Sequence, residues 1–275
     1  MSPPSGSEPL VGQAVPEGIL LRRGERFSLA VRRPDGTILV RTGRLPPAAL
    51  RGPAAKIPVL RGVLAVAEAL RGAAFAARSL GGGAGLSGLL ASAVGGLALF
   101  LLPEQITRLS GARRKSPLLA ALLEGAGRFG ALLGYLAIAS QNPQVRRLFQ
   151  YHGAEHKAVN AFEREGRTDG EAIRRASRLH ARCGSVFAAL LSLLSGLASP
   201  PEGRPPFVRV TEEAARALLL VGLAYELARW AARSDFPLAR ALLAPGFLLQ
   251  LLATKEPGDD QIEVARAALV GLLEG

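Results

Sequence analysis

Residues 151–157 read Tyr-His-Gly-Ala-Glu-His-Lys, and we expect this stretch to form the helix around which the chain is organised. At about 3.6 residues per turn, His152, Glu155 and His156 project from one face of such a helix. Two imidazoles four residues apart can bind one Zn²⁺, and the carboxylate beside them can take a proton from water on the metal. The H-x-x-E-H order is also that of the inverzincin peptidases. The stretch therefore predicts a metal site in which Glu155 is the general base.

The remaining metal-binding side chains lie close to this stretch. The 275-residue chain contains three His and one Cys, and all four lie within residues 152–183. A closed zinc site would use four ligands: His152, His156, His180 and Cys183. Alternatively, His180 and Cys183 belong to a helix start, where Cys183 packs as a small buried apolar residue.

The composition is typical of a membrane protein with basic loops. Apolar residues make up 49% of the chain and charged residues 20%, and the charges cluster between long uncharged runs. The net charge of +12 predicts cytoplasmic loops that contact the anionic lipid of a bilayer. We expect no nucleic-acid partner, because no motif for one appears. The single Cys excludes an intramolecular disulfide, and the first 30 residues lack the apolar core of a signal peptide.

The first 55 residues predict a tail and a small sheet. Residues 1–10 are rich in Ser, Pro and Gly and are expected to be disordered. Residues 11–55 form a β segment, in which 27–32 and 37–42 flank the turn Pro34-Asp-Gly36 as a hairpin. Because this segment is rich in Arg, we place it in the cytoplasm.

Residues 56–275 predict a bundle of membrane helices that carries the metal helix. The metal helix should cover about 144–165, opened by Pro143, and a second basic helix should cover 171–182. The helix predicted at 60–79 has a narrow polar strip, so it lies in the membrane interface, packs on the bundle or belongs to a soluble core. Four stretches are predicted spans: 79–103, 117–140, 183–201 and 213–234.

These elements predict a mainly α fold, a polytopic membrane bundle of about four spans plus interfacial helices, with a small N-terminal β-hairpin cap. A further apolar helix at 238–254 is expected to break at Pro245-Gly246. The loop 141–182 carries the most basic residues, which favours the cytoplasmic side of the membrane for the metal helix.

Ionisable side chains inside the predicted spans need partners. Glu124 and Arg128 are spaced i, i+4, so they form either a supporting ion pair in the bundle or part of the site. Glu226 interrupts the last span, and it is either the third metal ligand or the partner of Arg229. Three acidic residues near the end of the chain either cap the last helix or accept hydrogen bonds from the His ligands: Asp259, Asp260 and Glu263.

The stretch 149–157 closely resembles the signature of the YqhQ family, which comprises uncharacterised bacterial membrane proteins catalogued as predicted metal-dependent enzymes. The chain departs from the family pattern at Pro16, Ala181 and Ser185, none of which is a proposed ligand. The resemblance implies a metal-dependent function in a bacterial membrane, and it does not identify a substrate. The likeness extends to further segments at 12–18, 60–62, 180–184, 225–226 and 256–264.

The sequence favours a multi-pass zinc hydrolase at the bacterial inner membrane. His152 and His156 would hold the metal, Glu226 or Cys183 would complete the protein ligands, and Glu155 would be the base. Zinc is preferred because imidazole and thiolate ligands suit it. The substrate and the oligomeric state stay open.

Two other functions are compatible with the same residues. The first is a non-catalytic membrane protein whose structural zinc is bound by both His of the helix together with His180 and Cys183. The second is a transporter or scaffold with a metal-free polar pathway formed by Glu124, Arg128 and Glu226.

Overall fold

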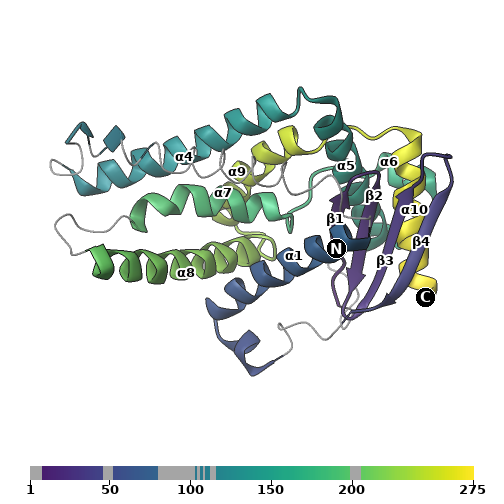
Figure 1. Cartoon of the computed structure of the whole chain (residues 1–275), viewed down its shortest axis with the longest axis horizontal. Helices are drawn as coiled ribbons and strands as arrows, with labels where there is room; N and C mark the ends of the chain where they lie inside the picture. Colours follow the sequence, from purple (N-terminus) through teal and green to yellow (C-terminus); the bar gives the residue numbers. More distant parts are fainter. Residues whose placement is uncertain are drawn as a thin grey trace.

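The computed structural model describes residues 8–45, 52–79, 103, 106–107, 109–111, 116–198 and 206–275. The described chain is elongated, with a bundle of helices at one end and a sheet covered by helices at the other (Figure 1). We call the first part the bundle and the second part the cap. Each part has its own hydrophobic core, and elements of both contribute to the site described below.

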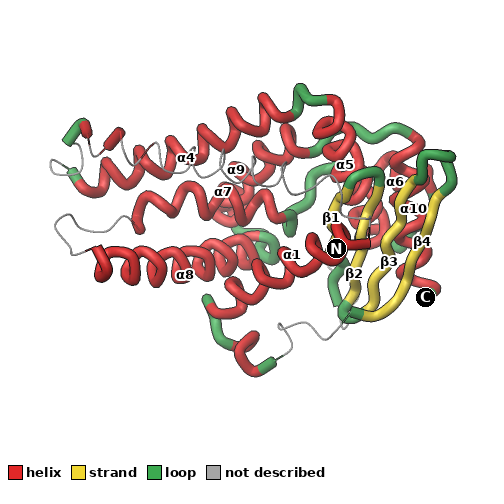
Figure 2. Tube along the Cα trace, in the orientation of Figure 1, coloured by secondary structure: helices red, strands yellow, loops and turns green. Residues whose placement is uncertain are grey.

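Four strands of the cap form an antiparallel meander in the order β1-β2-β3-β4 (Figure 2). The predicted hairpin is confirmed as β3–β4, and Gly36 in its turn has a φ of 85°, which glycine adopts without strain. The disordered tail predicted at 1–10 falls largely on residues 1–7, outside the described residues. The strands are β1 (Val11–Val15), β2 (Gly18–Arg23), β3 (Arg26–Arg32) and β4 (Ile38–Arg44).

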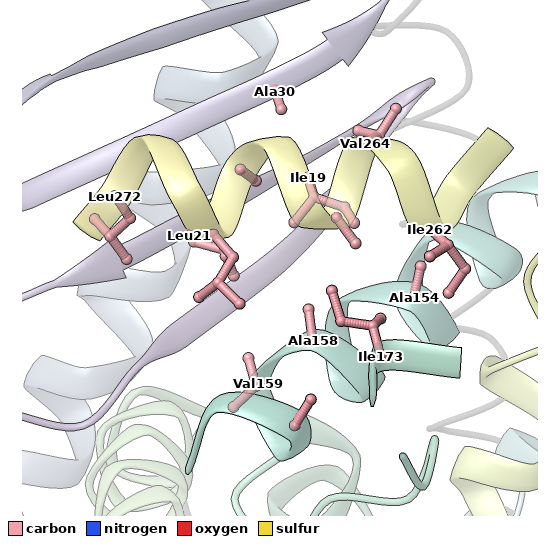
Figure 3. Packing of buried hydrophobic residues seen from close by; sticks show 14 of the residues in the cluster. Ile19, Leu21, Ala30, Ala154, Ala158, Val159, Ile173, Ile262, Val264 and Leu272 are labelled. Carbon is pink, nitrogen blue, oxygen red and sulfur yellow. The ribbon is translucent and has the colours of Figure 1, made fainter. Parts of the chain in front are cut away.

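One face of the sheet is covered by α5 (Pro143–Glu165), α6 (Gly170–Arg175) and α10 (Asp259–Glu274) (Figure 1). Side chains alternate along a strand, so Ile19 and Leu21 of β2 face these helices. They join Ala154 and Ala158 of α5 and Ile262 of α10 in the core of the cap (Figure 3). The opposite face of the sheet packs on α1 (Leu60–Ser79), a helix of the bundle.

Helix α5 confirms the helix predicted at 144–165. The Asn142 side chain caps it by accepting hydrogen bonds from the backbone N–H groups of Gln144 and Val145. Pro143 occupies the first turn, where its missing N–H costs nothing. Gly166 ends the helix in the left-handed conformation, with a φ of 68°.

The bundle helices lie along the long axis of the molecule (Figure 1). They are α1 (Leu60–Ser79), α4 (Pro117–Ala139), α7 (Gly184–Leu194), α8 (Pro206–Ala231) and α9 (Pro237–Ala253). Two short 3-10 helices, η2 (Pro53–Lys56) and η3 (Ser195–Ala198), precede α1 and follow α7. The helix predicted at 60–79 is α1, and it packs both on α8 and, through Phe75, on the outer face of the sheet.

Glycines let these helices approach one another closely. A Cβ atom on Gly125 of α4 would lie 2.1 Å from the carbonyl oxygen of Leu193. A Cβ atom on Gly196 would lie 1.9 Å from the carbonyl oxygen of Ala121. Both distances are far inside van der Waals contact, so this crossing of α4 with α7 and η3 requires glycine.

The structure supports one of the four predicted spans. Among the described residues, α4 alone is long and apolar enough to cross a membrane, and it matches the span predicted at 117–140. The span predicted at 79–103 lies almost wholly outside the described residues. Helix α7 is too short, and α8 is too polar because charged residues such as Glu226 and Arg229 lie along it. The mainly α fold with an N-terminal sheet is confirmed, and the polytopic membrane bundle is not.

The predicted break at Pro245-Gly246 is wrong. Helix α9 runs through Pro245 without interruption. A Cβ atom on Gly246 would lie 2.5 Å from the Cα of Val186 in α7, so the two backbones are in close contact at this point. This contact, which the local sequence of 238–254 does not reveal, holds the residues on both sides of Pro245 in one helix against α7.

We predict that Gly125→Ala destabilises the protein, whereas Gly130→Ala on the same helix does not. The methyl group at position 125 would overlap the Leu193 carbonyl oxygen, and overpacking of this kind costs about 1–3 kcal/mol. A Cβ atom on Gly130 would meet no atom within 4 Å, and the helix propensity of Ala should stabilise by up to about 1 kcal/mol. Thermal unfolding of both purified variants measures the difference. Equal stability of the two would contradict the close helix crossing.

Candidate metal centre

His152 and His156 of α5 meet Cys183 at the start of α7. Cys183 is the N-cap of α7, and its Sγ lies 3.5 Å from His152 Nε2. One ligand atom from each of the three side chains lies within 4.8 Å of the others. The two imidazole rings are in edge contact, with centroids 4.4 Å apart. The cap thus contributes two metal-binding side chains and the bundle contributes the third.

Backbone carbonyls fix where both imidazoles carry their protons. His152 Nδ1 lies 2.8 Å from the carbonyl oxygen of Ala253, and His156 Nδ1 lies 2.6 Å from that of Arg178. A carbonyl oxygen only accepts hydrogen bonds, so each Nδ1 must carry a proton. In the neutral rings both Nε2 atoms then keep a free lone pair. Histidines that bind metals are typically oriented by this kind of second hydrogen bond.

The three side chains fit zinc in chemistry and in spacing. Two imidazoles and one thiolate suit Zn²⁺, and three protein ligands are the usual number in a catalytic zinc site. With ordinary Zn–N and Zn–S bond lengths, a tetrahedral site separates a nitrogen ligand from a sulfur ligand by about 3.6 Å. The 3.5 Å between Cys183 Sγ and His152 Nε2 agrees with that value.

Glu155 lies beside these ligand atoms in a buried environment. Its side chain is 6% exposed, and its Oε2 lies 3.6 Å from His156 Nε2. Burial raises the pKa of Glu155, and the nearby His152 and His180 offset part of that shift. On its other side the carboxylate touches Gly12 of β1, where a Cβ atom would lie 1.9 Å from Oε1. Only a glycine at position 12 leaves room for this carboxylate.

His180 lies next to the three ligands without joining them. Its ring centroid is 5.7 Å from that of His156, and its Nε2 lies 3.6 Å from Oε2 of Glu163. Burial favours the neutral form of Glu163, but the bonds with His180 and Arg182 outweigh it and lower the pKa of this carboxyl. The closed site predicted as an alternative would require His180 to move toward the other three side chains.

Glu226 does not lie among the ligands. Its carboxylate instead receives two hydrogen bonds from the guanidinium of Arg61, so neither the predicted metal ligation nor the predicted pairing with Arg229 describes its main contact. The cause is the packing of α1 on α8, where a Cβ atom on Gly62 would lie 2.9 Å from the Cα of Gly222. This approach brings Arg61 to Glu226, although the two are 165 residues apart in the sequence.

Glu124 and Arg128 are buried inside the bundle and outside the ligand cluster. Glu124 accepts a hydrogen bond from the Thr107 hydroxyl, and Arg128 Nη1 donates to Ser195 Oγ at 3.1 Å. Arg128 thus contacts η3 and Glu124 contacts Thr107, whereas Glu226 lies between α8 and α1. Glu226, predicted to share one polar pathway with these two residues, therefore lies at a different interface.

The loop that carries Cys183 is held by side chains that the sequence analysis did not identify. Asn160 Nδ2 donates to the carbonyl oxygens of Ser177 and Leu179. The Gln250 amide forms two hydrogen bonds with the backbone of His180, and Arg178 donates to Thr254. These bonds draw the backbone out of helical geometry, so the helix predicted at 171–182 ends at Arg175. Buried amides between two helices are the signal that could have revealed this loop.

The segment 12–18 also has a role that the sequence analysis did not derive. Glu17, at the turn between β1 and β2, accepts two hydrogen bonds from Arg147 and one from the Tyr151 hydroxyl at 3.2 Å. The Arg147 bonds lower the pKa of Glu17, and burial raises the pKa of Tyr151 to about 12. This contact fixes β1 on α5, one residue from His152.

The acidic residues at the start of α10 do not bond to the His ligands. Asp259 pairs with Arg174, Asp260 with Arg147, and Glu263 with Arg32. The hydrogen-bond partners of both imidazoles are instead the backbone carbonyls of Ala253 and Arg178. Of the two predicted roles, the one as acceptors for the His ligands is therefore wrong.

The chain matches one family model and one curated relative that are both described as uncharacterised. The family model described as "Protein of unknown function (DUF1385)" matches residues 57–274. The "Uncharacterized protein YqhQ" of Bacillus subtilis (strain 168) is 39% identical over 138 residues, which are 49% of this chain and 43% of that protein. The match thus spans less than half the length of this curated relative. No solved structure matches the chain.

We predict that Gly153→Ala weakens metal binding and that Gly184→Ala does not. A Cβ atom on Gly153 would lie 2.1 Å from the Lys255 carbonyl oxygen, so the methyl group must push this segment and the Ala253 carbonyl away from α5. Loss of such an orienting bond lowers metal affinity about 10–100-fold. Gly184 begins α7 beside Cys183 and has open space around an added Cβ, which makes it the matched control.

Competition with a chelator of known zinc affinity measures both variants. Equal affinity of Gly153→Ala and wild type would contradict the role of the Ala253 carbonyl in orienting His152.

Proposed function

The chain belongs to the family described as proteins of unknown function (DUF1385), and we propose that this member is a membrane-embedded, zinc-dependent hydrolase. The observation that carries the proposal is the juxtaposition of three metal-ligand atoms with a buried carboxyl that is not one of them. His152, His156 and Cys183 would hold the ion. A bound Zn²⁺ would polarise and acidify water at its remaining position.

Glu155 supplies the base in this proposal. Its Oε2 lies 3.6 Å from His156 Nε2, so water next to the ligand atoms lies within reach of the carboxylate. Burial raises the pKa of Glu155, which makes the carboxylate a stronger base than an exposed one. Having accepted a proton from water, the same carboxyl can donate it to the leaving group.

The outer surface of the bundle supports the membrane location. Large apolar side chains are exposed on α4 and α8, which is costly in water and favourable in lipid. We propose that they contact the bilayer of a bacterial inner membrane, that basic loops contact its anionic lipid, and that α5 lies on the cytoplasmic side. The exposed side chains are Leu118, Leu119, Leu122, Leu123 and Ile138 on α4 and Leu218, Leu219 and Leu223 on α8.

A second candidate is a structural zinc site that fastens the cap to the bundle. The observation in its favour is that the ligands come from both parts, with His152 and His156 on α5 and Cys183 at the start of α7. A closed site needs a fourth ligand, and His180 is the nearest further imidazole. In such a site Glu155 would have no chemical role.

We predict about one zinc per chain in the purified protein, measured by elemental analysis. His152→Ala and Cys183→Ser should lose the metal, because each removes one of three ligands. Glu155→Gln should keep it, and so should Glu226→Gln, which serves as a control because Glu226 binds Arg61. His180→Ala separates the candidates, since it leaves an open three-ligand site intact and breaks a closed four-ligand site.

Hydrolytic activity completes this test. Glu155→Gln should retain zinc and lose about 10²–10⁴-fold in hydrolysis, as expected when a general base is removed. Wild-type protein prepared under metal-replete conditions and still free of zinc would contradict both candidates. Zinc lost in His180→Ala would favour the structural site over the hydrolase.

A further inference from the structure

Strand β1 presents an unpaired edge beside Glu155. It is the first strand in the order β1-β2-β3-β4, so only β2 pairs with it among the described strands. The register pairs Val15 with Gly18 across a two-residue turn, and Arg32 N–H donates to the Glu17 carbonyl on the β3 side. Hydrogen bonds alternate along an antiparallel strand. Even-numbered residues of β2 therefore bond to β1, and odd-numbered residues bond to β3.

The same alternation identifies the free groups of β1. Val11, Gln13 and Val15 face even-numbered residues of β2 and use their backbone groups there. The N–H and C=O groups of Gly12 and Ala14 consequently point away from the sheet. Within the described part of the chain, no other element forms a backbone hydrogen bond with these two residues. Both are partly exposed, and in Gly12 the exposed atoms belong to the backbone.

The free edge runs directly over the proposed catalytic carboxyl. Gly12 touches Glu155, whose Oε2 lies 3.6 Å from His156 Nε2. Glu17 fixes the other end of β1 to α5 through Arg147 and Tyr151. A ligand bonded to Gly12 and Ala14 would therefore lie next to the metal ligands, in a position set by the strand.

Helices cover both faces of β1, which limits the shape of such a ligand. On one face, Gln13 Nε2 donates to the Ala69 carbonyl of α1 at 3.0 Å, and Val15 lies in a cluster with Phe75. On the other face, Gly12 and Ala14 face α5 and the core of the cap. A ligand can therefore reach the backbone of Gly12 and Ala14 only from the edge of the strand, where both residues are partly exposed.

We propose that the substrate is an extended peptide segment that binds as an added strand along Gly12 and Ala14. This inference rests on the proposed hydrolase function and names its substrate class. The outward N–H and C=O groups of this edge alternate at the spacing of a peptide backbone. In strand addition, main-chain hydrogen bonds to such groups provide the affinity. A lipid acyl chain has no groups to match them.

In the reaction that follows, the peptide C–N bond breaks and a C–O bond forms between the carbonyl carbon and the oxygen of water. One proton of that water stays on the new carboxyl group. Glu155 takes the other and delivers it to the departing amine nitrogen, so the atoms balance and no oxidant or reductant is needed. The products are a peptide with a new carboxyl end and a peptide with a new amino end.

The test uses the zinc-loaded full chain, a mixture of random-sequence decapeptides with a fluorescent label, and Ala14→Pro. Proline removes the outward N–H of Ala14 and spares the bonds between β1 and β2, so the sheet should persist. Thr42→Pro is the matched control, because Thr42 lies at an outward position of β4 on the opposite edge. Zinc content and unfolding temperature verify that both variants fold.

Peptide binding is measured by fluorescence anisotropy with Glu155→Gln protein, which should hold peptide without cleaving it. We expect Ala14→Pro in this background to bind about tenfold more weakly and Thr42→Pro to bind as the parent does. If Ala14→Pro fails to fold, binding of unmodified peptides to Glu155→Gln protein is compared with binding of peptides methylated on alternate backbone nitrogens. Methylation should weaken binding by about the same factor, because it removes donors that the edge accepts.

The outcomes separate the inference from the proposed function. Peptides bound by Glu155→Gln through β1 but never cleaved by wild type would support the binding site and overturn the hydrolase. Zinc-dependent hydrolysis of a lipid ester, with no peptide bound, would leave the hydrolase standing and overturn the inference. Binding that is insensitive to both Ala14→Pro and N-methylation would also overturn it.

Discussion

The hydrogen bond from His152 Nδ1 to the Ala253 carbonyl oxygen is the contact on which the site depends. Ala253 ends α9 in the bundle, whereas His152 belongs to α5 in the cap. This bond leaves Nε2 of His152 to face Cys183, and it is possible only because Gly153 lets the following segment lie against α5. A larger residue at 153 would separate the parts that supply the ligands. The placement of the candidate ligands and the packing of the cap on the bundle therefore share one constraint.

A second constraint joins the sheet to the same helix. Gly12 leaves room for the Glu155 carboxylate, and Glu17 binds Arg147, about two helical turns earlier in α5. The small N-terminal sheet thus also forms part of the surroundings of Glu155. It closes one side of the carboxylate's environment, and the removal of water from that side contributes to the raised pKa of Glu155.

Much of the fold could be predicted from local signals. Asn142, Pro143 and Gly166 mark the ends of α5, and the turn at Pro34-Asp35-Gly36 marks the β3–β4 hairpin. Such features act over a few residues, so the sequence alone reveals them. The proximity of His152, Glu155 and His156 follows in the same way from helical geometry.

The parts that escaped prediction depend on contacts between distant residues. Glu226 is partnered by Arg61 across two helices, and Gln250 holds the loop before Cys183 from α9. Neither partner can be identified from spacing along the chain, and a lone carboxylate in an apolar stretch is equally consistent with a metal or a guanidinium partner. Hydropathy predicted more membrane spans than the described helices support. The reason is that hydropathy does not distinguish a helix packed on other helices from a helix packed on lipid.

The order of elements along the chain has a consequence for synthesis. The cap is assembled from β1–β4, α5, α6 and α10, whereas all five described bundle helices are made after the sheet and before α10. Residues of α10 fill the core between the sheet and α5, so this core stays open until the last helix is made. The three histidines and the cysteine are therefore synthesised before the core of the cap is complete. The core of the cap therefore closes only after the described helices of the bundle have been made.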